Sequence, residues 1–408
     1  MIDEVSISSE PLELPSEAVE FRDRLCAFLH KALPQSERDA GRDRGEVAGW
    51  SAERHRAFKR ELGRRGFIGT TWPREYGGRE MPAVFDLILA EEMEYHDAPA
   101  GSGVDSSVVY LPQLLIQHGS QELKAAHLPR LLLGEETVFL GYSEPEAGTD
   151  LASLKTSAQR QDDVYIVNGQ KSYSSFAHIA DYCLLAARTG SDRYNGISLF
   201  WVDMTSPGIT VSFDNTITGA RHPAVRFDDV RVPEAALVGT ENDGWRTLMG
   251  AIDHERSALA SAGLVESHLR RLIATTRRVQ EASSQSEPMP HRLWDKTLDL
   301  TLAALSAKLL NVEIAAQRQR GEVAPAFPTM AQFLKRSTVR NLEIAGHHRT
   351  SLRGDEHFRT SNECWPTVTY DLREHAYFTF AAGGFDIAHE IIARRALGVR
   401  ANTKDEKR

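Results

Sequence analysis

The chain has 408 residues, which is enough for two or three domains of about 150 residues each. With 41% hydrophobic and 26% charged residues it has the composition of an ordinary globular protein, which excludes a largely disordered or collagen-like chain. The net charge of −9 repels phosphate backbones and anionic lipid, so we do not expect nucleic acid as a partner.

The sequence shows no membrane span and no targeting signal. No apolar run approaches the roughly 18 residues of a transmembrane helix, and the acidic start MIDEVSISSE lacks a signal-peptide pattern. We therefore expect a cytoplasmic protein. Its cysteines, Cys26, Cys183 and Cys364, are scattered and form no CxxC, so they predict small buried or half-buried residues and neither disulfides nor a metal site.

The first predicted domain is helical and covers residues 15–133, after a loose tail at residues 1–14. Two segments carry apolar residues at helical spacing. Between them lies GFIGTTWPREYGG, residues 66–78, whose glycines and proline predict a tight turn. The apolar positions are Val19, Phe21, Leu25 and Phe28 in the first segment, and Phe85, Leu87, Ile88, Leu89 and Met93 in the second.

The pattern then changes to short strands, which predicts a small antiparallel β-domain over residues 134–240. Turn sequences such as Asn168-Gly169 separate the apolar runs. The expected strands are Val138–Leu140, Val164–Val167, Tyr182–Ala187, Ile197–Val202 and Ile209–Phe213.

Helical spacing returns at Gly244, and we expect a C-terminal helical domain over residues 241–400, followed by a charged tail. Helices, strands and helices in this order indicate an α+β fold and not a doubly wound sheet, which alternates strand and helix. Neither GxGxxG after a strand nor GxxxxGK[ST] occurs, which argues against a Rossmann dinucleotide site and a P-loop.

Glu255 is the most informative candidate for chemistry. It lies in DGWRTLMGAIDHERSALASAG, residues 243–263, where Leu248, Ile252, Glu255 and Leu259 share one helical face. A carboxylate on an apolar stripe either pairs with an arginine such as Arg256 or, in a dry cleft, gains a raised pKa and abstracts a proton. The pattern alone favours the ion pair and leaves both interpretations open.

Two further segments have compositions that suit a planar ligand. The segment GYSEPEAGTDLASLKT, residues 141–156, follows a predicted strand and offers small residues and hydroxyls. The segment NGQKSYSSF, residues 168–176, begins with a hairpin turn signal and places Tyr173 and Ser175 on the same side of a predicted strand. On composition alone, an ordinary loop and a solvent-facing tyrosine and serine are the favoured alternatives.

Six stretches in register over residues 66–397 resemble the acyl-CoA dehydrogenase family. They are GFIGTTWPREYGG, ILAEEMEYHDAPAG, GSQELKAAHLPRLLLGEETVFLGYSEPEAGTD, YIVNGQKSYSSFAHIADY, VRFDDVRVPEAALVG and FDIAHEIIARRALG. The resemblance implies the fold of that family, with an N-terminal helical domain, a central antiparallel β-domain and a C-terminal four-helix bundle.

The resemblance also implies FAD as cofactor and an acyl-CoA thioester as substrate, with electron-transfer flavoprotein as the electron acceptor. Ser143 takes the place of the usual threonine and keeps the hydroxyl, and Tyr173 stands where the family usually has a tryptophan. Thr149 and Arg256 are the expected substrate contacts. The isoalloxazine ring would lie against Leu140, Tyr142, Ser143, Thr149, Tyr173, Ser174 and Ser175.

The position of the catalytic base differs within the family. Most members carry a glutamate near the C-terminal end, where this chain has Ala382. One branch, which includes the isovaleryl and long-chain enzymes, places its glutamate on the helix after the β-domain and before an arginine. That position is Glu255, so the resemblance favours Glu255 as the base that removes the α proton.

Two stretches depart from the family at the adenine end of FAD. The family's R-x-x-F-G stretch corresponds to residues 277–283, which have an arginine but no Phe-Gly. Its Q-x-x-G-G stretch corresponds to residues 343–348, where Glu343 replaces the glutamine and only Gly346 remains of the glycine pair. A carboxylate facing a pyrophosphate is repelled by about 1 kcal/mol or more.

These departures favour a hetero-oligomer, such as a heterotetramer with a second acyl-CoA-dehydrogenase-like subunit of the kind used in actinobacterial steroid catabolism. A homo-oligomer with altered FAD contacts stays open, although a symmetric assembly must use the same patch on both sides. Other open alternatives are an oxidase, a flavin monooxygenase and a non-catalytic partner subunit. Retention of Glu255 with the flavin-ring residues argues against the last.

Overall fold

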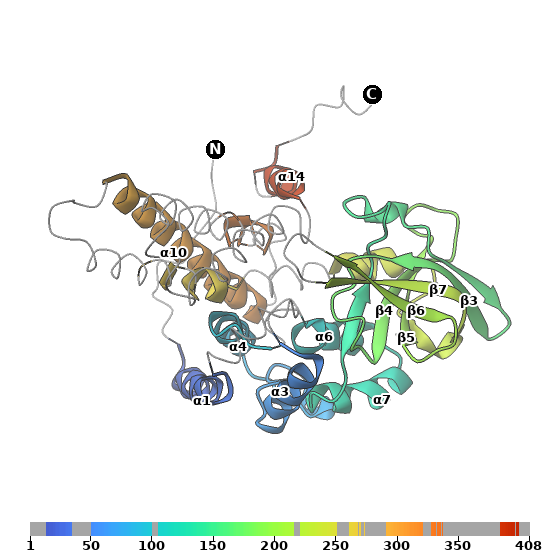
Figure 1. Ribbon diagram of the computed structural model, residues 1–408, viewed down its shortest axis with the longest axis horizontal. Coiled ribbons are helices and arrows are strands. Elements are labelled where there is room, and N and C mark those ends of the chain that lie inside the picture. The colour runs from blue at the N-terminus through green and yellow to red at the C-terminus, as the bar shows by residue number, and fades with distance from the viewer. Residues whose placement is uncertain are drawn as a thin grey trace.

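The computed structural model describes residues 14–34, 50–99, 105–215, 221–250, 261–267, 269–270, 273, 291–320, 328–331, 333–335, 337, 384–395 and 397–399. A β-sheet occupies one end of the molecule and the long helix α10 (His291–Gln319) the other, with α4 (Val84–Tyr95) and α6 (Leu111–His118) between them (Figure 1). Helices therefore precede and follow the sheet along the chain, which confirms the predicted α+β fold.

The N-terminal helices bury one apolar face each. In α1 (Ser16–Ala32) the buried residues are Ala18, Phe21, Leu25 and Leu29. Val19 is 43% exposed, so its assignment to the buried face was wrong, and the neighbouring Ala18 lies there instead. Serine side chains cap two of the helices by accepting a backbone N–H. The remaining N-terminal helices are α3 (Ala52–Arg64), α5 (Ser106–Val109) and α7 (Gln121–Leu132).

The glycine-rich connector turns as its sequence predicts. It contains the short 3₁₀ helix Arg74–Tyr76, and Gly69 has φ +72°, a conformation that side chains disfavour. Trp72 is only 1% exposed, and a Cβ on Gly78 would lie 2.1 Å from the backbone oxygen of Trp72. The connector therefore packs tightly around this indole and joins α3 to α4.

The sheet has eight strands in the order β6-β7-β3-β2-β4-β5-β8, with β1 beside β4. It is antiparallel, as predicted, except that β4 pairs in parallel with β1 and β2. The strands are β1 (Val138–Gly141), β2 (Ser157–Gln161), β3 (Val164–Lys171), β4 (Tyr182–Arg188), β5 (Ile197–Asp203), β6 (Ile209–Asn215), β7 (Arg221–Pro233) and β8 (Leu237–Val238).

Three of these strands have no continuous apolar signal. In β7 the buried Val225, Phe227, Val230 and Val232 alternate with or flank charged residues, and a bulge in β3 shifts the register opposite them. Strand β2 is mostly exposed and polar, and β8 has two residues. Their pairing partners, and not their own sequences, determine that they are strands.

The C-terminal part contains α10 and α14 (Phe385–Arg395). Helix α10 packs against α4, and charged groups lie where α4 meets this part of the chain. Lys335 Nζ donates to Glu94 Oε1 at 2.6 Å. One carboxylate oxygen of Glu91 is buried without a hydrogen-bond partner among the described residues, and burial raises the pKa of this carboxyl to about 7, although Lys308 opposes the shift.

Replacing Glu91 by glutamine is expected to stabilise the protein at pH 8 and to leave its stability nearly unchanged at pH 4. Between about pH 4.5 and pH 7, Glu91 keeps a proton in the folded protein that it releases in the unfolded chain. The stability of the wild type therefore falls as pH rises through this window. Above this pH window, the glutamine variant should exceed the wild type in free energy of unfolding by about 3 kcal/mol. Urea unfolding of both proteins at both pH values measures it, and an equal difference at the two values would contradict the shifted pKa.

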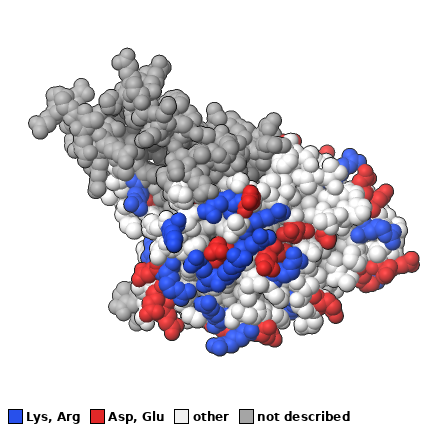
Figure 2. Space-filling view, turned by 60° about the horizontal axis from the view of Figure 1, so that its bottom comes forward, with Lys and Arg blue, Asp and Glu red and all other residues white. Residues whose placement is uncertain are grey.

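Within the described ranges, no helix is long and apolar enough to cross a membrane. The negative net charge is not spread evenly over the surface. Figure 2 shows lysine and arginine side chains gathered in a band, with acidic side chains interspersed, on the face turned forward. Charged side chains of both signs therefore share this face.

Candidate functional site

Two chain segments that contain predicted ligand-binding residues meet just beyond the ends of β1 and β3. The first, residues 140–149, begins in β1 and continues into the following loop. The second, residues 172–175, follows the end of β3. The backbone N–H of Ser172 donates to the carbonyl of Ser143 at 2.9 Å, so the structure brings Ser143 next to the segment that carries Tyr173, Ser174 and Ser175.

A buried ion pair fixes the first loop to β3. Lys171 is fully buried, and its Nζ donates to Glu144 Oε1 at 2.8 Å and to the carbonyl of Tyr142 at 3.0 Å. The Glu144 carboxylate also accepts the backbone N–H groups of Lys155 at 2.7 Å and Thr156 at 2.9 Å. One lysine and one glutamate therefore hold both ends of the loop against the strand.

The charge of Glu144 is maintained by these partners. Burial alone would raise its pKa, but Lys171 and the hydrogen bonds hold the pKa of Glu144 below its ordinary value. Gly169 in β3 allows the close approach, since a Cβ there would lie 2.4 Å from Thr156 Oγ1. The loop is thus a rigid feature of the sheet.

The second segment is a strained turn and not a strand. Strand β3 ends at Lys171, and the φ angles of Tyr173 and Phe176 are +54° and +66°, values that non-glycine residues seldom adopt. The expectation that Tyr173 and Ser175 share one side of a strand was therefore wrong. Such strain persists where surrounding contacts enforce it, commonly at functional sites.

The strained turn exposes an aromatic ring and buries a hydroxyl. Tyr173 is 69% exposed and lies 6.4 Å from the His222 ring, edge to face. Ser174 is fully buried and donates its backbone N–H to the Pro223 carbonyl at 3.0 Å, yet its Oγ has no partner among the described residues. An exposed ring beside an unsatisfied hydroxyl suits a flat ligand with polar edges.

The remaining predicted residues fit the same ligand class. Leu140 and Ser143 are half-buried, Tyr142 is buried, and Thr149 is exposed in the loop. Among the described residues, the hydroxyls of Ser143, Thr149 and Ser175 make no hydrogen bond. The isoalloxazine of FAD, with its apolar faces and hydrogen-bonding edge, has the chemistry that this set of side chains accommodates.

A second buried charge cluster supports both segments from the N-terminal helices. Lys59 Nζ lies 3.1 Å from Asp105 Oδ2, 2.8 Å from the Glu136 carbonyl and 2.6 Å from Thr137 Oγ1, directly before β1. His55 Nε2 lies 2.8 Å from Asp105 Oδ2. Despite burial, Lys59 and His55 hold the pKa of Asp105 well below its usual range, so Asp105 is a carboxylate here.

This cluster also reaches the strained turn. The His55 ring packs on the Phe176 ring with their centroids 4.6 Å apart. Since Lys59 holds the residues before β1 and His55 contacts the turn after β3, the α3 helix positions both parts of the candidate site. Composition did not single out Lys59 or Asp105, but Lys171 continues the period-two positions of the buried Tyr165 and Val167, a signal that could have identified it.

Several predicted residues lie outside the described part of the chain. These are Glu255 and Arg256, the alanine at 382, and both stretches expected at the adenine end of FAD. The described residues resume at Ser261. A Cβ on Gly263 would lie 2.0 Å from the carbonyl oxygen of Glu91. The segment that carries Glu255 therefore continues into a close contact with α4.

The chain is similar to one protein family over most of its length. The family description "Acyl-CoA dehydrogenase, N-terminal domain" matches residues 15–135, and "Acyl-CoA dehydrogenase, middle domain" matches residues 140–230. Acyl-CoA dehydrogenase FadE29 of Mycobacterium tuberculosis is 34% identical over 352 residues, covering 85% of this chain and 88% of the relative. Acyl-CoA dehydrogenase FadE26 of the same organism is 35% identical over 371 residues, covering 84% and 87%.

Solved structures agree with these relatives. The Tcur3481-Tcur3483 steroid ACAD superposes with a TM-score of 0.84 at 26% identity and covers 96% of this chain and 100% of its own. The ChsE4-ChsE5 complex from Mycobacterium tuberculosis superposes with a TM-score of 0.83 at 27% identity, again covering 96% and 100%. Both structures are named for two different proteins.

Proposed function

The chain belongs to the acyl-CoA dehydrogenase family, and we propose that it oxidises the Cα–Cβ bond of an acyl-CoA thioester with FAD as cofactor. The observation that carries this proposal is the meeting of the Ser143 loop with the strained Tyr173 turn. It supports a flavin-ring site in the position that the resemblance implies. Bound FAD would accept a hydride from Cβ.

Each protein group has a proposed part in the site. The Tyr173 ring and Leu140 provide apolar contact for the isoalloxazine, and the available hydroxyls bond its polar edge. Glu255 removes the α proton, and Thr149 and Arg256 contact the substrate. The flavin-ring residues are Leu140, Tyr142, Ser143, Thr149, Tyr173, Ser174 and Ser175.

Substituting Tyr173 by alanine is expected to weaken FAD binding about fivefold, because an aromatic contact contributes about 1 kcal/mol. The free energy of unfolding should change by less than about 0.5 kcal/mol, since the ring is exposed. Titration of the flavin-stripped protein with FAD, followed by flavin fluorescence, measures the affinity. Tyr173→Trp is the matched control and should keep it; an unchanged affinity of the alanine variant would remove Tyr173 from the site.

The substrate class that we propose is a bulky acyl-CoA from steroid degradation. Support comes from the similar structure that is named as a steroid ACAD, and from the position of Glu255, which the resemblance associates with a branch that takes branched and long acyl groups. Electron-transfer flavoprotein is the proposed acceptor, again by resemblance. Activity assays with steroid side-chain and straight-chain acyl-CoA test the substrate class.

We also propose that a second, related subunit completes the assembly. Helix α10 carries a stripe of leucines that is 53–69% exposed, and an exposed apolar stripe of this kind marks a protein interface. Glu343 at the expected pyrophosphate contact and the two-protein complexes among the similar structures favour unlike subunits. The stripe consists of Leu298, Leu302, Leu305 and Leu309.

The assembly is tested by purifying the chain alone and after co-expression with related subunits encoded beside it. The protein to FAD ratio and the mass in solution are recorded for each preparation. We expect the chain alone to retain little FAD and the pair to retain it. Full FAD occupancy of the isolated chain, with flavin bleached by acyl-CoA, would refute the need for a second subunit.

A further inference from the structure

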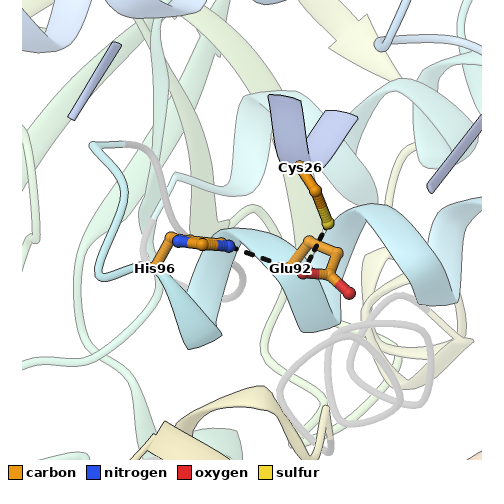
Figure 3. Close-up of side chains that lie close together, drawn as sticks. All are labelled: Cys26, Glu92 and His96. Carbon is orange, nitrogen blue, oxygen red and sulfur yellow. Dashed lines mark hydrogen bonds and ion pairs between the residues drawn. The ribbon is translucent and has the colours of Figure 1, made fainter. Parts of the chain in front are cut away.

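Three potential metal ligands of different kinds meet between α1 and α4, away from the flavin-ring residues. They are Cys26 of α1, and Glu92 and His96 at the C-terminal end of α4 (Figure 3). One ligand atom from each, a thiol sulfur, a carboxylate oxygen and an imidazole nitrogen, lies within 4.8 Å of the others. Atoms this close can share one ion after small side-chain movements.

Helical geometry explains why these residues converge. Glu92 and His96 are four positions apart, so they lie on the same face of the last turn of α4. Cys26 faces them from α1, where Cys26 Sγ donates to Glu92 Oε2 at 3.2 Å. His96 Nε2 lies 3.7 Å from the same oxygen.

The two oxygens of Glu92 face different neighbours. Oε1 accepts from Arg22 Nε at 2.6 Å, while Oε2 faces Cys26 and His96. Arg22 therefore orients the Glu92 carboxylate from the side opposite Cys26 and His96, as an outer partner of a metal ligand commonly does. Glu92 is buried, so this orientation is maintained by packing as well.

The local field favours a cation at the shared point. The C-terminal end of a helix carries partial negative charge, and Glu92 belongs to the last turns of α4. Without a cation, the Cys26 thiol serves as the hydrogen-bond donor to Glu92. A divalent metal would instead bind the thiolate and release its proton to solvent.

We propose that Cys26, Glu92 and His96 form a binding site for a divalent transition metal, with zinc as the favoured ion. Thiolate, imidazole and carboxylate together match the ligand preference of Zn²⁺, whereas Mg²⁺ and Ca²⁺ prefer oxygen ligands alone. Water completes the coordination sphere. The ion would link α1 to α4 and stabilise the N-terminal helices.

The test is a titration of the chelator-treated, full-length protein with Co²⁺ and then Zn²⁺. Cobalt bound to a thiolate gives a charge-transfer band in the near ultraviolet, and zinc should displace it. We expect one equivalent of metal per chain and a higher melting temperature with zinc. Cys26→Ser and His96→Asn should each weaken binding by about 100-fold or more, because loss of an outer partner alone costs 10- to 100-fold.

Cys183→Ser is the matched control, because Cys183 is the other cysteine in the described part of the chain and lies on β4. It should leave the cobalt band and the stoichiometry unchanged. Thermal unfolding without metal shows whether each variant folds. The proposal is overturned if the folded wild-type protein gives no cobalt–thiolate band, or if the band survives in Cys26→Ser; the three residues would then be a hydrogen-bonded tie between helices only.

Discussion

Replacing Glu255 by glutamine is expected to lower the rate of flavin reduction by acyl-CoA by about 10³-fold, within the range that general bases contribute. Glutamine keeps the size and polarity of the side chain but cannot take the α proton. The affinity for FAD and acyl-CoA should therefore stay nearly constant while the chemical step is lost. Anaerobic stopped-flow measurement of flavin bleaching separates the rate of this step from binding.

Asp253→Asn is the matched control for Glu255→Gln. Asp253 is a carboxylate in the same short segment but is not on the apolar stripe of Leu248, Ile252 and Leu259. The control should bleach at nearly the wild-type rate. If Glu255→Gln bleaches as fast as the wild type, Glu255 is not the base and its sequence pattern reflects an ion pair.

Replacing Lys59 by methionine is expected to destabilise the protein by about 3–5 kcal/mol, the cost of leaving a buried charge without its partner. Lys59 is 1% exposed and bonds Asp105, Ser107, the Glu136 carbonyl and Thr137, so one substitution removes all of these contacts. Because β1 begins directly after Thr137 and leads into the Ser143 loop, FAD retention should fall as well. Urea unfolding gives the stability change, and the FAD to protein ratio gives the effect on the site.

Arg60→Met provides the control, since Arg60 is the exposed neighbour on the same helix. It should change the free energy of unfolding by less than about 0.5 kcal/mol. Combining Lys59→Met with Asp105→Asn should cost less than the sum of the two single changes, because both belong to one cluster. A loss below about 1 kcal/mol for Lys59→Met alone would contradict the role given to this buried lysine.

Much of the fold follows from local patterns in the sequence. Apolar spacing identified the segments that form α1 and α4, and the strands β1, β3, β4, β5 and β6. The exceptions are β2 and β7, whose charged and polar residues face solvent while a few partners on neighbouring strands bury the rest. Such strands are determined by pairing across the sheet, which a local window does not contain.

Only part of the candidate site could be predicted from the sequence. The resemblance supplied the residues that we propose to surround a flavin ring, and composition drew attention to the Ser143 loop. The strained turn at Tyr173 was missed because left-handed backbone angles at tyrosine have no sequence signal. Lys59 and Asp105 were missed since they are distant in sequence, and their pairing exists only in the folded chain.

The Cys26 cluster shows the same limit. Cys26 has no ligand spacing with the other cysteines, so the sequence predicted an isolated buried residue. Glu92 and His96 have a spacing of four that is common on helices for many reasons. Only the packing of α1 on α4 brings the thiol to the other two side chains.

The measurement that tests the proposed activity most directly is anaerobic addition of acyl-CoA to the FAD-loaded protein, purified with its partner subunit where the chain alone lacks flavin. Steroid side-chain and straight-chain acyl-CoA are added in turn, and the visible flavin absorbance is recorded. We predict that at least one substrate bleaches the flavin in proportion to occupied sites and yields an α,β-unsaturated acyl-CoA. A fully FAD-loaded protein whose absorbance stays constant with every acyl-CoA would contradict this function.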